Sequence, residues 1–139
     1  MKAFAIWLAI VAVVFGGYAL ITTMLRETNQ VFVFVDSSVQ MEPVWRNVHR
    51  ELDGIDDRDH TEFALAHGQS FSGSELVHSW QPALTLPNDV RPFAGCSFET
   101  VSFAEAEDAD ERILITTTGN ECAEQVTALT DWTIIELTP

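Results

Sequence analysis

The pattern of hydrophobic and polar positions divides the chain into one long apolar segment and several shorter ones. Residues 3–24 contain no charged side chain, and a helix of this length, at about 1.5 Å per residue, spans a hydrocarbon core of about 30 Å. Residues 31–35 (VFVFV) are a continuous run of β-branched and aromatic side chains. Such a run predicts a strand buried on both faces, at the centre of a parallel sheet.

Alternating and periodic segments follow this strand. Residues 41–52 carry an apolar stripe at steps of three and four, which predicts a helix that ends near Asp53-Gly54. Residues 62–67 alternate and predict a second strand. Residues 74–80 are interpreted as a short helix, and the proline-punctuated residues 82–92 as a loop.

The last third of the chain repeats the alternation of strands and helices. Residues 98–103 predict a short strand or edge segment, and residues 112–117 a buried strand, with an acidic turn between them. A helix over 121–129 and a last strand over 132–137 complete the pattern. Strand, helix and strand at both ends of the domain predict an α/β fold: a small doubly wound, mostly parallel sheet with helices on both faces.

The apolar amino-terminal segment sets the predicted domain organisation. Residues 1–26 are interpreted as a single-pass transmembrane anchor, with membrane contact through residues 3–24. Lys2 precedes the segment, whereas Arg26 is followed by an acidic residue, which favours a cytoplasmic amino terminus. Residues 27–139 then form an α/β domain outside the cytoplasm, in the periplasm if the cell is Gram-negative.

A cleaved signal segment is the alternative interpretation of the same residues. Gly17 and Ala19 are small residues of the kind found at cleavage sites. The apolar run exceeds the 7 to 15 residues usual for the core of a signal peptide. The anchor is therefore preferred, and both interpretations place the domain outside the cytoplasm.

Charge and cysteine content restrict the partners and the compartment. All 21 acidic residues follow Arg26, where only five arginines and no lysine oppose them, a net charge of −16. Such a surface repels a polyanion, so nucleic acid is not an expected partner. Cys96 and Cys122 are the two cysteines. In an oxidising compartment a lone pair predicts a disulfide, the alternative being two free thiols.

Candidate binding residues follow the first strand directly. In open α/β sheets ligands bind beyond the carboxyl ends of the strands, which is where Asp36, Ser37 and Ser38 stand. The alternative is that Asp36 and Ser38 cap the following helix by accepting hydrogen bonds from its free amide groups.

The motif VFVFVDSSVQM before an amphipathic helix, together with ILITTTGN, a helix and DWTIIEL, resembles a small von Willebrand factor type A domain. In that family a DxSxS motif at the end of the first strand holds a divalent cation, normally magnesium. The resemblance places Asp36, Ser38 and Gln40 at these positions, so the third hydroxyl is replaced by an amide. The family's supporting aspartate corresponds to Thr118, which has no carboxylate. The resemblance thus implies a degenerate metal site that binds magnesium weakly or holds no ion.

The resemblance implies adhesion or assembly rather than catalysis. The predicted function is a membrane-tethered, extracytoplasmic protein-interaction module. Its binding face is predicted around Asp36, Ser37, Ser38 and Thr118, toward an unidentified protein partner. The alternative is a metal-dependent hydrolase or transferase that uses Asp36. The sequence contains no GxSxG, HExxH or GxxxxGK[ST] motif to support an enzyme, and the chain is interpreted as a non-enzyme.

Overall fold

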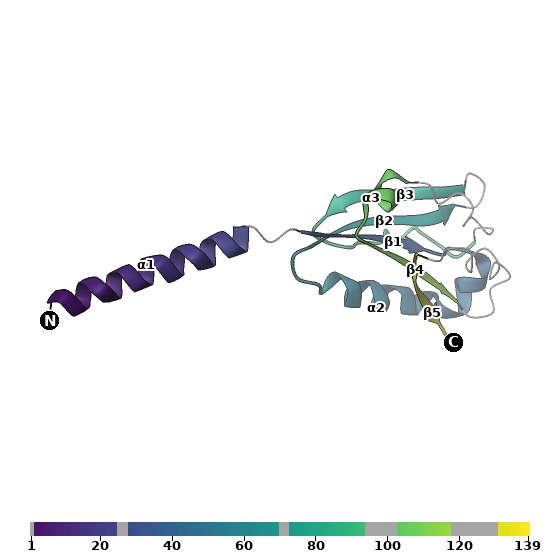
Figure 1. The fold of residues 1–139 in the computed structure, drawn as a ribbon. Helices are drawn as coiled ribbons and strands as arrows, with labels where there is room; N and C mark the ends of the chain where they lie inside the picture. Colours follow the sequence, from purple (N-terminus) through teal and green to yellow (C-terminus); the bar gives the residue numbers. More distant parts are fainter. Residues whose placement is uncertain (1, 25–27, 70–72, 94–102, 118–130) are drawn as a thin grey trace.

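The computed structural model describes residues 2–24, 28–69, 73–93, 103–117 and 131–139. These residues form an amino-terminal helix, α1 (Lys2–Met24), followed by a domain built on one five-stranded sheet (Figure 1). The α/β class predicted for the domain is therefore confirmed. Of the helices that the structure describes, none combines the length and the apolar character required to cross a membrane.

The sheet has four parallel strands and one antiparallel strand at its edge. Its order is β3-β2-β1-β4-β5. β1 pairs in parallel with β2 and β4, β5 is parallel to β4, and β3 is antiparallel to β2. The strands have these bounds: β1 Asn29–Val35, β2 Thr61–Gln69, β3 Gly73–Gln81, β4 Glu111–Thr117 and β5 Thr133–Leu137. The predicted central position of residues 31–35 is confirmed, because β1 has two strands on each side.

One face of the sheet packs against the helix that connects β1 to β2. The chain leaves β1 through a 3₁₀ turn, η1 (Val39–Val44), and continues as α2 (Trp45–Asp56). The apolar side chains of α2 recur at the spacing of one helix face, which lies on the sheet (Figure 1). The core on this face contains Val31, Val33, Val35, Met41, Val44, Val48, Leu52, Ile55, Phe63, Leu65, Leu84, Leu86, Val90, Ile113, Ile115 and Leu137.

The opposite face of the sheet is more aromatic. Phe32 lies 5.8 Å, between ring centroids, from both Phe103 and Trp132. The short helix α3 (Ala104–Asp108) lies over this face (Figure 1) and buries Ala106 against it. Side chains of β1 therefore contribute alternately to two cores, which explains why its run of apolar residues is unbroken.

Two local predictions are wrong. Residues 74–80 belong to strand β3 rather than to a helix, because Val77 packs on one face of the sheet while Leu76 and Trp80 pack on the other. The acidic segment after residue 103 is not a turn throughout, since residues 104–108 form α3. α2 also continues to Asp56, past the predicted end near Gly54.

Several other predictions lie outside the described residues. These are the strand over 98–103 and the helix over 121–129. Of these residues only Phe103 is described, and it belongs to no strand. The predicted disulfide between Cys96 and Cys122 and the binding-face residue Thr118 also fall there.

Candidate functional site

The candidate site lies at the carboxyl end of the sheet, where the parallel strands β1, β2, β4 and β5 end. From β1 the chain first adds β2 and β3 on one side and then crosses to add β4 and β5 on the other. The connections therefore diverge between β1 and β4, and this switch point is where open α/β sheets bind ligands. Asp36 follows β1 directly, and its amide donates to the carbonyl of Ile115 in β4 (2.9 Å).

Asp36 links the ends of β1 and β4. Its Oδ2 accepts a hydrogen bond from the hydroxyl of Thr116 (2.7 Å), and its Oδ1 accepts one from the amide of Ser38 (2.8 Å). Asp36 is 3 % exposed and Thr116 is 2 % exposed. Hydrogen bonds to an ionised acceptor in a buried site are stronger than neutral ones. The carboxylate therefore holds the switch point together from inside the domain.

The two serines that follow Asp36 differ in their bonding although both are buried. The hydroxyl of Ser37 donates to the carbonyl of Gly68, at the end of β2. The hydroxyl of Ser38 is buried and has no hydrogen-bond partner among the residues that the structure describes. Ser38 precedes η1, but its side chain makes no capping bond. The capping interpretation is therefore wrong for Ser38, and its hydroxyl is an orphaned polar group.

The side chains predicted to hold magnesium fit the ion poorly. Magnesium requires nearly octahedral coordination by oxygen. Asp36 supplies the only carboxylate of the set, and both of its oxygens already accept hydrogen bonds. Of the three predicted ligands, Ser38 has a hydroxyl oxygen that makes no hydrogen bond to the described residues. Gln40 is half-buried and already has an interaction of its own. Within the described part of the chain, no three acidic, histidine or cysteine side chains form a metal-binding group.

A cleft of about 150 Å³ lies beside this site and was not predicted from the sequence. It opens between the end of β2, the start of β3 and the loop before residue 94. Its lining residues are His67, Gly68, Glu75, Asp89, Val90, Arg91 and Phe93. Gly68 connects it to the switch point, because its carbonyl accepts the hydroxyl of Ser37. The lining residues come from three separated segments, so no motif marks them.

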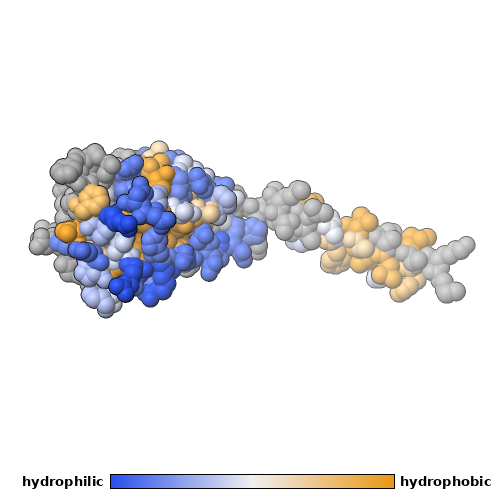
Figure 2. Space-filling model, turned by 180° about the vertical axis from the view of Figure 1, so that it is seen from behind, coloured by the Kyte–Doolittle hydropathy of each residue, from blue (hydrophilic) through white to orange (hydrophobic). Residues whose placement is uncertain are grey.

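Two exposed apolar side chains lie at this end of the domain. Outside α1, Val39 (59 % exposed) and Phe93 (61 % exposed) are the large hydrophobic residues exposed in the described part of the chain. Val39 begins η1 just after Ser38, and Phe93 lines the cleft. Figure 2 shows hydrophobic atoms at the end of the domain remote from α1, beside an otherwise largely hydrophilic surface. Asp36, Ser37 and Ser38 are buried beneath this surface and do not form it.

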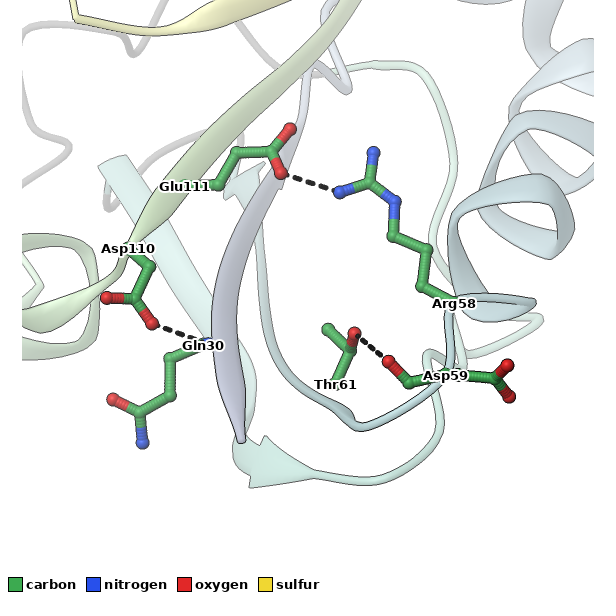
Figure 3. Close-up of polar contacts among 6 residues, drawn as sticks. All are labelled: Gln30, Arg58, Asp59, Thr61, Asp110 and Glu111. Atoms are coloured by element: carbon green, nitrogen blue, oxygen red, sulfur yellow. Dashed lines mark hydrogen bonds and ion pairs between the residues drawn. The ribbon is translucent and has the colours of Figure 1, made fainter. Parts of the chain in front are cut away.

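The amino end of the sheet carries polar contacts of a different kind (Figure 3). Arg58 pairs with Glu111 at 2.6 Å, with both side chains about one third exposed. A carboxylate oxygen of Asp110 accepts the amide of Gln30 (2.9 Å), and the hydroxyl of Thr61 donates to a backbone carbonyl (3.1 Å). Apart from the buried Thr61, these groups are exposed or partly exposed, and each has a hydrogen-bond or ion-pair partner, which is typical of a structural role.

Comparison of the chain with models of protein families, with curated protein sequences and with solved structures gave no match in any of the three. The assignment of a function therefore depends on the residues and their geometry.

Proposed function

We propose that this protein is a membrane-tethered, extracytoplasmic protein-interaction module whose contact face is the carboxyl end of the sheet. The contact face consists of Val39, Phe93 and the rim of the adjacent cleft. Asp36 acts beneath it as a positioning residue, because it fixes the end of β1 to β4 and the amide of Ser38. A binding module needs a rigid surface rather than a catalytic set.

The observation that carries the proposal is the location of the exposed apolar side chains. Single exposed hydrophobic residues are common on proteins, but two at one end of an otherwise strongly acidic domain are a candidate pair of interface anchors. Interfaces use apolar anchors surrounded by polar residues. The charged residues of the cleft supply such a rim beside Phe93.

In this proposal α1 is the tether, although no described helix meets the length and apolar character required to cross a membrane. Large side chains of α1 are exposed, among them Phe4 (67 %), Phe15 (71 %) and Tyr18 (69 %), and the proposal places them against lipid. α1 connects to the amino end of β1, which is seven residues long. At about 3.3 Å per residue, the strand carries the contact face roughly 23 Å away from that connection. A tethered domain therefore presents the contact face toward a partner rather than toward the membrane.

The resemblance to von Willebrand factor type A domains supports the same conclusion, because that family implies adhesion or assembly. In this proposal the degenerate motif at Asp36, Ser38 and Gln40 has a structural role, with magnesium bound weakly or not at all. The fit of the oxygen atoms supports this, since Asp36 is engaged by two donors. The net charge of the domain, −16, favours a partner with a basic surface.

Site-specific photo-crosslinking in cells tests the contact face. A photoreactive residue is placed in the full chain at position 39 or 93, and, as controls, at the exposed positions Arg50 and Glu136. We expect one discrete crosslinked partner from positions 39 and 93. With the photoreactive residue at position 39, Phe93→Ser abolishes this crosslink, and with the photoreactive residue at position 93, Val39→Ser abolishes it. Equal crosslinking from all four positions, or none from 39 and 93, would contradict the proposal. A periplasm-active reporter fused after Pro139 tests the topology independently, because it stays inactive if the domain is cytoplasmic.

A metal-dependent hydrolase or transferase is the second candidate, favoured by one observation: the buried, unpartnered hydroxyl of Ser38 next to Asp36. A cation bound there would stabilise the fold by an amount that grows with the ratio of its concentration to its Kd. Thermal unfolding of the full chain in excess magnesium, manganese or calcium tests this. A gain in stability that Asp36→Ala and Ser38→Ala both abolish would favour the metal site. No gain over sodium at equal ionic strength would exclude metal-dependent chemistry at Asp36.

A further inference from the structure

The size of the cleft limits what it can hold. Its volume is about 150 Å³, whereas sites for drug-sized ligands measure roughly 300 to 1,000 Å³. A protein cavity of about 150 Å³ accommodates a molecule of the size of benzene. The cleft therefore suits a small metabolite or a single side chain.

The charges in the cleft have opposite signs and do not pair with one another. Glu75 and Asp89 are exposed carboxylates, and Arg91 is an exposed guanidinium. Among the described residues, no ion pair joins Arg91 to either carboxylate. A simple anion would meet two carboxylates, and a simple cation would meet the guanidinium. A small ligand that carries both charges complements the lining better than either.

The remaining lining residues are His67, Gly68, Val90 and Phe93, which include an imidazole and an aromatic ring. The Nδ1 of His67 lies 2.7 Å from the carbonyl of Gly68, within hydrogen-bond distance. His67 is directly opposite Glu75 in the pairing of β2 with β3. Phe93 lines the same cleft with 61 % of its surface exposed, and gives an apolar ligand group a surface to contact.

We infer that this cleft binds a zwitterionic α-amino acid with an apolar side chain. Its carboxylate pairs with Arg91, its ammonium group with Glu75 and Asp89, and its side chain lies against Phe93. The inference goes beyond the proposed function and does not depend on it. It gives the domain a small-molecule site beside its contact face, so the two share Phe93 and the ligand competes with the partner for this ring.

Calorimetric titration of the full chain in non-ionic detergent tests the inference. The probes are L-leucine, N-acetyl-L-leucine, which lacks the ammonium group, and L-leucinamide, which lacks the carboxylate. We expect weak binding of L-leucine, at micromolar to millimolar concentration. We expect a loss of about tenfold or more with either blocked compound, because each removes a charge-assisted contact. Glycine, which has no side chain for Phe93, binds more weakly than L-leucine.

Substitutions at exposed positions separate the ligand contacts from folding. Arg91→Gln weakens L-leucine binding but not L-leucinamide binding. Glu75→Gln with Asp89→Asn weakens the binding of L-leucine and of L-leucinamide but not that of N-acetyl-L-leucine. Arg46→Gln in α2 and Glu136→Gln in β5 are matched controls and change neither affinity. Binding of L-leucinamide as strongly as L-leucine would overturn the inference in favour of a cation site, such as a site for a basic side chain of a partner. No binding of L-leucine, L-phenylalanine or glycine at millimolar concentration would also overturn it.

Discussion

The polar groups at the two ends of the sheet differ in their burial and in their hydrogen bonding. At the amino end, Arg58, Glu111 and Asp110 lie at the surface and pair with nearby groups. At the carboxyl end, Asp36 is buried with its two donors, and the hydroxyl of Ser38 has no partner in the described part of the chain. The cleft beside it holds charges that do not pair with one another.

We infer from this difference that the amino end of the sheet serves stability and that the carboxyl end carries the proposed contact. Polar groups that satisfy one another at the surface stabilise a fold slightly and can be replaced at little cost. Buried polar groups are expensive unless they are bonded, so an orphaned one is either a tolerated defect or part of a binding site. The carboxyl end of the sheet combines such a group with exposed apolar side chains and a cleft, which is why we assign the contact there.

The largest expected effect is that of Asp36→Ala. This change removes the carboxylate that accepts hydrogen bonds from the buried hydroxyl of Thr116 and the amide of Ser38. We expect the free energy of unfolding to fall by about 3 kcal/mol, since removing the acceptor of a buried donor costs about 1 to 3 kcal/mol. Chemical denaturation of the full chain in detergent measures the change. Asp110→Ala is the matched control at the amino end, because Asp110 also accepts a backbone amide, that of Gln30, but is exposed. Equal losses from the two variants would contradict the comparison.

The adjacent serines provide a smaller and sharper test. Ser37→Ala removes a bond to the carbonyl of Gly68, and we expect a loss of about 1 kcal/mol. Ser38→Ala removes a buried hydroxyl that has no partner in the described structure, and we expect a change within about 0.5 kcal/mol, or a slight gain. The same denaturation curves measure both. A larger loss from Ser38→Ala than from Ser37→Ala would show that Ser38 makes an interaction absent from the described residues.

The smallest effect is expected at the amino end. The ion pair between Arg58 and Glu111 is partly exposed, and such pairs contribute up to about 1 kcal/mol and weaken in salt. A double-mutant cycle of Arg58→Gln and Glu111→Gln measures the coupling energy at low and high salt. A coupling energy well above about 1 kcal/mol that salt leaves unchanged would contradict the comparison. It would mean that polar groups at the amino end stabilise the fold as strongly as those at the carboxyl end.

The strands with the clearest sequence signals were predicted correctly. The continuous apolar run of β1 follows from its two buried faces. The same reasoning predicted β4, and it placed Asp36 directly after β1. β3 was missed because its pairing with β2 shifts register around Leu65, which disturbs the regular alternation of a strand. Its apolar residues therefore resembled the spacing of a helix.

The candidate site was predicted only in part, and for a physical reason. Topology alone places Asp36 at the switch point. Which of two adjacent serines finds an acceptor depends on the carbonyl of Gly68, 31 residues away from Ser37. The cleft depends on Glu75 in β3 and Arg91 in the following loop lining the same space. Contacts of this kind come from the packing of distant segments and leave no spacing in the sequence.

The central position of β1 also governs the order in which the domain can be completed. β1 is synthesised first, yet its partner β4 follows 80 positions later, with Val31 opposite Glu111. Contacts between such distant segments form slowly. Until β4 arrives, the nascent chain exposes an uncharged, proline-free run of valine and phenylalanine of the type that aggregates. We therefore expect chaperone dependence during biogenesis to be concentrated in residues 31–35.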